Sequence, residues 1–172
     1  MAYIARSLTA LLERPPADKA IVVFGARQTG KTTLLEHLFQ DRKVKWLSGD
    51  EPQDRELLMS LSSKADISIL LSGLDVLVID EAQRIQGIGM LLKRLEDSKP
   101  SCRIFATGSS SLELAGGVME SAAGRLWPMT LFPLSVSELA DHNSWLDVME
   151  SLPIRLTVGS YPEIVTHPQR SK

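Results

Sequence analysis

The sequence has 172 residues and a formal net charge of −2, with 44% hydrophobic and 23% charged residues. This length allows one domain with a hydrophobic core of its own, and the composition excludes a disordered chain. The small negative charge argues against a broadly basic surface for nucleic acid, although it leaves room for a local basic patch.

The first predicted elements are a helix and a strand. Residues 3–13 carry four aliphatic side chains on one side, a pattern typical of an amphipathic helix, and the prolines at 15–16 end it. The apolar run AIVVF at 20–24 predicts a strand.

The eight residues after this strand, GARQTGKT, fit the phosphate-binding P-loop pattern G-x-x-x-x-G-K-[ST]. A helical pattern follows at 32–39, so the segment has the strand before it and the helix after it that a P-loop requires. Glycine lets backbone N–H groups close on phosphate oxygens, and the helix N-terminus attracts the anion. A strand–helix turn without a ligand is the alternative interpretation, which this context disfavours.

The loop residues have expected roles. Lys31 carries its charge to the β- and γ-phosphates, the Thr32 hydroxyl is a Mg²⁺ ligand, and Thr33 supports the loop or the α-phosphate. Arg27 either contacts phosphate or is a solvated surface residue. The predicted phosphate-binding residues are Gly25, Ala26, Arg27, Gln28, Thr29, Gly30, Lys31, Thr32 and Thr33.

The next segment alternates between strand and helix. VKWLS at 44–48 predicts a second strand, residues 53–61 a helix that begins near Pro52, and residues 65–73 a helix with loop.

A second motif ends the following strand. LDVLVIDE at 74–81 is an apolar strand that ends in two acids, the Walker B form. We expect Asp80 to hold Mg²⁺, directly or through water, and Glu81 to orient and activate an attacking water. Two solvated acids at a strand end are the alternative, and the P-loop upstream makes it the weaker one.

The rest of the chain continues the alternation. The predicted elements are a helix at 88–95, a strand at 103–107, a helix at 112–120, a strand at 126–131, a helix opened by a Ser135–Glu138 capping box, short helices at 145–152 and 154–158, and a turn at 159–162.

Strands alternating with helices predict an α/β fold whose parallel sheet has helices on both faces. Because Gly25, Asp80 and Thr107 all lie at carboxyl ends of strands, we expect them to face one crevice.

These motifs together resemble the bacterial and archaeal P-loop ATPases of the AAA+-like group. The segments that carry the resemblance span nearly the whole chain in family order: GARQTGKTTLLEHL (25–38), VLVIDEAQRI (76–85), IFATGSSSLEL (104–114), ESAAGRLWPMTLFPLSVSEL (120–139) and GSYPEIV (159–165). The resemblance implies a three-layer P-loop NTPase fold with a parallel sheet of strand order 5-1-4-3-2 and a short helical C-terminal extension. It alone implies ATP as the nucleotide, because the sequence contains no base-reading motif.

The resemblance also implies two further site residues. A polar residue after the middle strand commonly senses the γ-phosphate in such ATPases, and Ser109 is the first choice, with Thr107 second. A polar strand end that caps the next helix is the alternative for both. Arg125 occupies a position where the family keeps an arginine, and it is a catalytic candidate for contacting the γ-phosphate of its own or a neighbouring subunit. Pairing with a local acid such as Glu120 is the alternative for Arg125.

Members of this group usually continue for roughly another domain, whereas this chain stops at Lys172. We therefore expect a P-loop ATPase core at 1–140, with its N-terminal helix at 3–13, and a helical extension at 141–172 that begins a truncated lid or linker. The missing region puts turnover in question.

The predicted function is Mg²⁺-dependent ATP binding and hydrolysis, with Glu81, Lys31 and Arg125 as catalytic residues and Thr32 and Asp80 as metal ligands. The alternative is a slowly hydrolysing switch that reports ATP or ADP to a partner or to a missing C-terminal domain. A P-loop kinase is a third interpretation, which the acid pair argues against because a kinase should exclude water.

The remaining features concern partners and location. The single cysteine, Cys102, offers no disulfide framework and no metal cluster. No run approaches the ~20 apolar residues of a membrane span, and the N-terminus lacks a signal-peptide pattern, so we expect a cytoplasmic protein without membrane contact. The sequence does not specify a protein or nucleic-acid client, and oligomerisation stays open.

Overall fold

The centre of the molecule is a parallel sheet. A computed structural model describes residues 3–98, 101–109 and 124–166. Within these ranges the strands are β1 (Ala20–Phe24), β2 (Val44–Ser48), β3 (Val76–Asp80), β4 (Arg103–Gly108) and β5 (Leu126–Thr130). They form one sheet in the order β2-β3-β4-β1-β5, and all neighbouring pairs are parallel. The predicted α/β class and the strand order 5-1-4-3-2 are confirmed, since the observed order is the same series read from the other edge.

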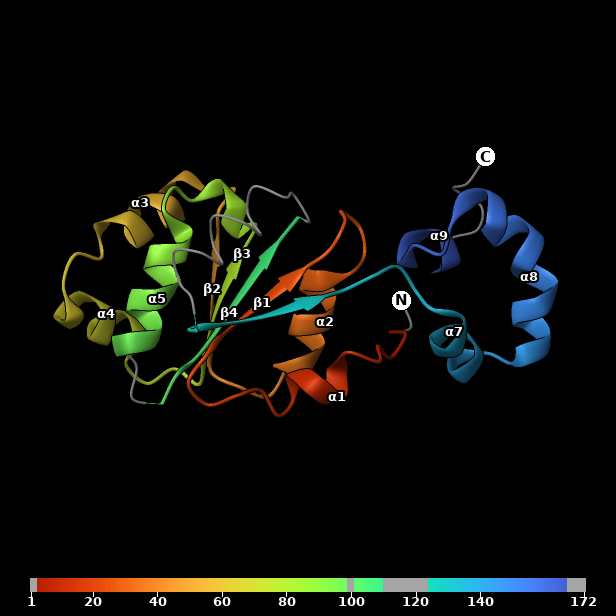
Figure 1. The fold of residues 1–172 in the computed structure, drawn as a ribbon, viewed down its shortest axis with the longest axis horizontal. Helices are drawn as coiled ribbons and strands as arrows, with labels where there is room; N and C mark the ends of the chain where they lie inside the picture. The colour runs from red at the N-terminus through yellow and green to blue at the C-terminus, as the bar shows by residue number, and fades with distance from the viewer. Residues whose placement is uncertain (1–2, 99–100, 110–123, 167–172) are drawn as a thin grey trace.

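Helices cover both faces of this sheet (Figure 1). The helices on one face are α1 (Thr9–Leu12) and α2 (Lys31–Leu38), and those on the other are α3 (Pro52–Ser60), α4 (Lys64–Leu71) and α5 (Ile88–Ser98). Along β1, Ile21 and Val23 belong to the core under α2, whereas Val22 belongs to the core under α3, α4 and α5. Both faces of the central strands β1, β3 and β4 are therefore buried, which explains their largely apolar runs in the sequence, whereas the edge strands β2 and β5 are only partly buried.

A further group of helices lies beyond the sheet, at the right of Figure 1. It consists of α7 (Val136–His142), α8 (Trp145–Val158) and α9 (Pro162–Thr166), and we call these three helices the helical unit. Leu134, Leu139 and Val148 form its small core together with Ile4 from the N-terminal segment. The expected boundary between 1–140 and 141–172 falls inside α7, and this division stays a prediction.

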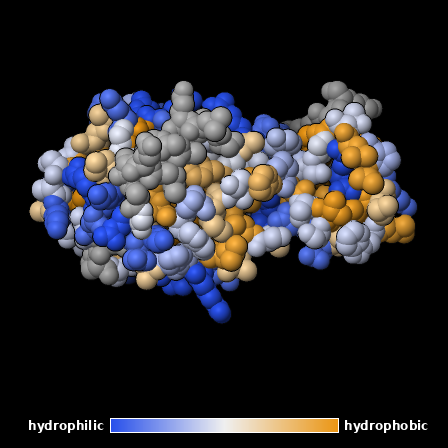
Figure 2. Space-filling view, in the orientation of Figure 1, coloured by the Kyte–Doolittle hydropathy of each residue, from blue (hydrophilic) through white to orange (hydrophobic). Residues whose placement is uncertain are grey.

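Residues 145–158 form the single helix α8, so the prediction of two short helices at 145–152 and 154–158 is wrong. The helix continues through Pro153 because the fixed φ of proline is compatible with helical backbone, although its missing N–H removes one hydrogen bond. In this turn the Ser151 hydroxyl and the Arg155 guanidinium both donate to the Val148 carbonyl. Figure 2 shows apolar surface over the helical unit, where α8 exposes Trp145, Leu146, Met149, Ile154 and Leu156.

The predicted N-terminal helix at 3–13 is wrong over most of its length. Only Thr9–Leu12 are α-helical, and residues 3–6 have no regular structure. The reason is that Ile4 packs into the core of the helical unit while Leu12 packs under the sheet against α2, so the segment serves two separate cores. A continuous helix would present both side chains to the same partner.

The other predicted helices are confirmed with small changes in their bounds, α3 for 53–61, α4 for 65–73 and α5 for 88–95. The capping box at the start of α7 is also present. The helix predicted at 112–120 lies outside the described residues. Of the helices that the described ranges contain, none has the length and apolar character needed to cross a membrane.

Candidate functional site

The carboxyl ends of three strands bring the predicted site residues together. The Gly25 N–H, just after β1, donates to the Gly108 carbonyl at the end of β4 (3.2 Å). The Thr107 hydroxyl donates to Oδ1 of Asp80, the last residue of β3. The expectation that these three positions lie together is confirmed, and they lie at the carboxyl ends of the strands, where parallel sheets bind ligands.

Residues 25–31 form a tight loop between β1 and α2. Gln28 and Gly30 have left-handed φ values of 65° and 88°, and glycine takes this conformation without steric cost. The Thr29 hydroxyl donates to the Ala26 carbonyl across the loop (2.9 Å). Left-handed residues beside right-handed ones turn successive N–H groups to one side, which creates a concavity suited to an anion. Because α2 begins at Lys31, its N-terminal end adds positive potential at the same place.

The Lys31 side chain folds back onto this loop. Its Nζ donates to the carbonyls of Gly25 and Ala26, each at 2.9 Å, and the residue is only 6% exposed. Burial lowers the pKa of Lys31 below its ordinary value, while the carboxylates of Glu81 and Asp80 act in the opposite direction. The ammonium is thus held at the loop by carbonyl partners that a phosphate oxygen can replace.

Gly25 is required by a close backbone approach. A Cβ at this position would lie 2.4 Å from the Leu131 carbonyl oxygen and 3.0 Å from the Thr29 hydroxyl. The Leu131 N–H donates to the Phe24 carbonyl (2.7 Å), so the chain after β5 is fixed against the start of the loop.

We expect Gly25→Ala to lower the free energy of unfolding by about 1–3 kcal/mol, because the new methyl group displaces either the loop or the backbone after β5. Urea denaturation measures this loss. Gly73→Ala is the comparison for the other way in which a glycine can be required: Gly73 has a φ of 71° and no atom within 4 Å of an added Cβ, so its loss comes from backbone strain alone, whereas Gly25 does not have a positive φ and its loss comes from packing alone. A Gly25→Ala variant as stable as the wild type would contradict the packing argument.

Thr32 and Asp80 meet at the first turn of α2. The Thr32 hydroxyl donates to Asp80 Oδ2 (2.9 Å), and Asp80 Oδ1 also accepts from the Glu81 N–H (3.1 Å). A hydroxyl and a carboxylate are oxygen ligands of the kind that Mg²⁺ takes together with phosphate and water. The residues therefore fit this ion, and the described ranges contain no cluster of three or more His, Cys, Asp or Glu that could hold a metal ion.

Glu81 sits in a left-handed conformation after β3, with a φ of 48°. Its carboxylate accepts a hydrogen bond from the Gln83 amide in the short helix η1 (Ala82–Arg84), and Gln83 Oε1 accepts from the Ser109 N–H (3.3 Å). Gln83 thus joins the predicted water-activating acid to the end of β4. The sequence analysis assigned no role to Gln83, although this residue lies in the segment VLVIDEAQRI that carries the family resemblance.

The remaining predicted contacts lie around this centre. Ser109 is half-buried next to Gln83. Thr107 is fully buried, and its hydroxyl donates a hydrogen bond to the Asp80 carboxylate. Arg27 in the loop and Thr33 on α2 are exposed. Contacts of Ser109, Arg27 and Thr33 with phosphate stay predictions.

Arg125 lies at the other end of the strands, directly before the first residue of β5. Its carbonyl accepts from the N–H of Ala20, the first residue of β1 (2.9 Å), and its Nε pairs with Oδ1 of Asp97 on α5 (2.8 Å). Because Gly25 follows the far end of β1, this position does not bring Arg125 to the loop of its own chain. The own-subunit alternative is therefore corrected, and the observed partner is Asp97, while Glu120 lies outside the described residues. A contact with a neighbouring subunit stays a prediction.

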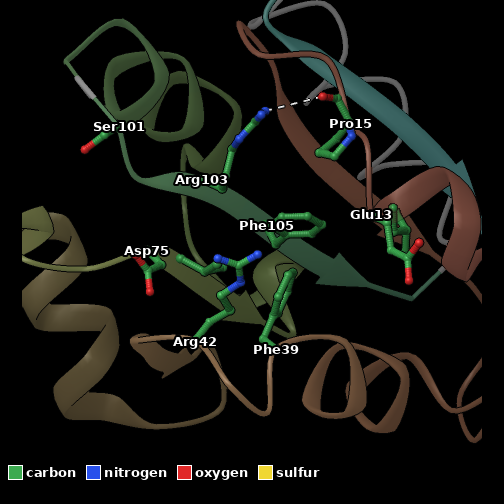
Figure 3. A pocket seen from close by; sticks show the side chains of 10 residues that line it. Glu13, Pro15, Phe39, Arg42, Asp75, Ser101, Arg103 and Phe105 are labelled. Carbon is green, nitrogen blue, oxygen red and sulfur yellow. Dashed lines mark hydrogen bonds between the residues drawn. The ribbon is translucent and has the colours of Figure 1, made fainter.

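A cavity of about 270 Å³ also lies at this end of the strands, where β3 and β4 begin (Figure 3). Its lining includes Val76 and Arg103, the first residues of β3 and β4, and the rings of Phe39 and Phe105, which pack edge to face. The cavity is therefore separate from the P-loop, which follows the other end of the strands.

A buried residue beside the loop was not predicted either. Arg6 is 7% exposed, and its Nη1 donates to the Thr29 carbonyl (2.7 Å). The N-terminal segment therefore contributes directly to the phosphate loop.

Solved structures that share this fold include two archaeal ATPases. A Walker-type ATPase of Pyrococcus abyssi is 17% identical with a TM-score of 0.57, and the match covers 88% of this chain and 63% of that one. A Signal Transduction ATPase with Numerous Domains (STAND) protein of Pyrococcus horikoshii, which has a tetratricopeptide repeat sensor, is 14% identical with a TM-score of 0.62, over 93% of this chain and 28% of that one. This chain therefore spans less than two thirds of either protein, and at these identities the likeness concerns the fold alone.

No curated protein matches the sequence. The family described as the AAA domain matches residues 17–140, a span that includes the P-loop, Asp80, Glu81 and all strands of the sheet described above. The chain therefore belongs to the AAA domain family of P-loop ATPases.

Proposed function

We propose that this domain binds ATP together with Mg²⁺ at the loop 25–32 and hydrolyses the terminal phosphoanhydride bond. The contact between the Thr32 hydroxyl and the Asp80 carboxylate supports this most directly, because these two proposed Mg²⁺ ligands lie next to Lys31 and Glu81. Groups for binding phosphate, metal and water are thereby adjacent.

Each side chain has a distinct part in the proposed reaction. Lys31 exchanges its carbonyl partners for oxygens of the β- and γ-phosphates, and the loop N–H groups bind the same anion. Thr32 and Asp80 would hold Mg²⁺, which when bound neutralises negative charge on the phosphate oxygens. Glu81 orients a water and accepts its proton as the water oxygen attacks the γ-phosphorus and ADP leaves.

Two observations favour slow hydrolysis and hence the switch as the second candidate. Arg125 does not reach the loop of its own chain, and an arginine at the γ-phosphate raises phosphoryl-transfer rates by about 10³-fold or more. The Glu81 carboxylate is also engaged by Gln83, a contact that must loosen or rearrange before Glu81 takes a water.

The proposal is tested by measuring nucleotide binding and steady-state phosphate release on the same preparation. We expect saturable ATP and ADP binding that requires Mg²⁺ for full affinity, and phosphate release that falls to background when EDTA removes the metal. Binding with near-zero release would support the switch, and phosphate transfer to an added acceptor in place of release would support a kinase. A protein that binds neither nucleotide would contradict the proposal.

A further inference from the structure

Arg6 connects three separate parts of the molecule through one guanidinium group. Its Nη1 donates to the Thr29 carbonyl in the P-loop (2.7 Å), its Nη2 to the Phe132 carbonyl after β5 (2.6 Å), and its Nε to Glu138 Oε1 on α7 (3.3 Å). The Arg6 and Glu138 side chains are 5% and 8% exposed, so this ion pair is shielded from solvent. If one of these partners moves away, the buried guanidinium charge is less well compensated. The three contacts therefore depend on one another.

Glu138 is itself tightly held. Its Oε2 accepts from the Ser135 N–H (2.8 Å) in the capping box of α7, and its Oε1 accepts from the Ser7 N–H (2.7 Å). Burial acts to raise the pKa of Glu138, but the backbone N–H donors and Arg6 outweigh it, so that the pKa lies below its ordinary value. The ionised Glu138 carboxylate thereby holds the N-terminus of α7 against the N-terminal segment of the chain.

The helical unit also reaches the P-loop through α9. The atoms nearest to a Cβ built on Gly30 are Cγ of Pro162, the first residue of α9, at 3.6 Å and Nη1 of Arg6 at 3.7 Å. The Leu134 N–H donates to the Ser160 carbonyl (2.8 Å), which joins the segment before α7 to the segment before α9. One side of the P-loop therefore faces Arg6 and α9 together.

The peptide bond between Thr29 and Gly30 makes this contact relevant to phosphate. In a planar trans peptide the C=O and the N–H point in opposite directions. When Arg6 holds the Thr29 carbonyl on its own side, the Gly30 N–H points to the other side, where the loop can present it to an anion. Any rotation of this peptide on ligand binding must move the Thr29 oxygen relative to Arg6.

We propose that Arg6 is a positioning residue that couples the P-loop to the helical unit, so that phosphate binding at the loop is transmitted through the Arg6–Glu138 pair to α7. This inference rests on the proposed nucleotide binding and adds the route by which the nucleotide state reaches the helices. Because such coupling is reciprocal, a movement of the helical unit would also change the geometry of the P-loop through Arg6.

Two variants of the pair test the coupling in the full chain. Arg6→Lys keeps the charge, but a single ammonium cannot reproduce the fork that binds three acceptors, so we expect affinity for Mg²⁺–ADP to fall about 10-fold or more. Glu138→Gln keeps a residue that a capping box accepts, but it removes the charge and one acceptor oxygen, so either the Ser7 N–H or the Ser135 N–H loses its partner. We expect it to lose the response of α7 and to weaken Mg²⁺–ADP binding less than Arg6→Lys does, because Arg6 keeps its hydrogen bonds to the Thr29 and Phe132 carbonyls.

The response is measured by amide hydrogen exchange with and without saturating Mg²⁺–ADP. In the wild type we expect nucleotide to change exchange in α7 and α8 as well as in the P-loop. In both variants of the pair the change in α7 and α8 should disappear at saturation while the change in the P-loop remains. A merely structural role would not separate these two signals.

Arg103 supplies the matched control. Its Nη1 donates to the carbonyls of Pro16 (2.8 Å) and Pro15 (3.4 Å), so it also anchors the N-terminal segment through backbone oxygens, but at the opposite edge of the sheet (Figure 3). Arg103→Ala should lower the melting temperature and leave both nucleotide affinity and the response of α7 unchanged.

The outcomes separate this inference from the proposed function. Wild-type protein that binds nucleotide without any change in α7 and α8 would overturn the coupling alone, as would a variant of the pair that keeps the full response. If Arg6→Lys does not fold, Glu138→Gln decides the question. Wild-type protein that binds no nucleotide would overturn the proposed function, and the coupling with it.

Discussion

Replacing Glu81 with glutamine is expected to lower ATP turnover by about 100-fold or more and to leave nucleotide affinity unchanged. Glutamine has nearly the same shape and its Oε1 can still accept the hydrogen bond from Gln83, so the local geometry is kept. What disappears is the carboxylate that accepts the proton of the attacking water. Phosphate release at saturating Mg²⁺–ATP measures the loss, and a nucleotide titration measures the affinity.

The matched control for this prediction is Asp75→Asn. Asp75 directly precedes β3, at the opposite edge of the sheet from Glu81, and its carboxylate accepts from the Lys43 N–H (2.9 Å). The control removes one negative charge from the same strand region, so it reveals any general effect of charge. Equal turnover in Glu81→Gln and Asp75→Asn would remove Glu81 from the proposed mechanism.

The parts of the structure that followed from sequence are those with a repeated physical signal. The central strands β1, β3 and β4 are buried on both faces, so their sequences are largely apolar runs, and the family order placed them together with the less buried edge strands β2 and β5. The Thr32–Asp80 contact was predictable because motif chemistry and parallel topology both bring these residues to one edge. Here local pattern and overall fold point to the same answer.

The placement of Arg125 shows where a family expectation competed with topology. Arg125 directly precedes β5. In a parallel sheet all strands begin on the same side, and the P-loop follows the opposite, carboxyl end of β1. The predicted topology therefore already contradicted a contact between Arg125 and the loop of its own chain. Only the local partner, Asp97 on α5, required the structure.

Arg6 had no such signal, and the segment that contains Gln83 did not indicate which residues Gln83 contacts. The contact between Arg6 and Glu138 joins residues 132 positions apart, and it exists only because the N-terminal segment runs between the sheet and the helical unit. The aliphatic residues at 3–13 mimic a helical stripe, although Ile4 and Leu12 belong to different cores. Tertiary packing outweighed local periodicity at this segment.

Replacing Lys31 with alanine is expected to weaken nucleotide binding by about 10- to 100-fold, because each hydrogen bond to a charged group contributes about 1.5–3 kcal/mol. The effect on the nucleotide-free protein should be much smaller. Removing Lys31 takes away two bonds to loop carbonyls, but it also removes a buried ammonium whose desolvation already lowers its pKa. Thermal unfolding with and without Mg²⁺–ADP measures both quantities.

The ligand-induced stabilisation makes this test quantitative. At a nucleotide concentration ~100 times the wild-type Kd, binding stabilises the wild type by about 2.7 kcal/mol, whereas a variant with 100-fold weaker affinity gains only about 0.4 kcal/mol. Lys19→Ala is the control, since Lys19 is half-buried just before β1, at the edge of the sheet opposite to the P-loop. Full stabilisation of Lys31→Ala by nucleotide would mean that the loop amides and Mg²⁺ ligands bind the phosphates without the ammonium, and the proposed role of Lys31 would then be lost.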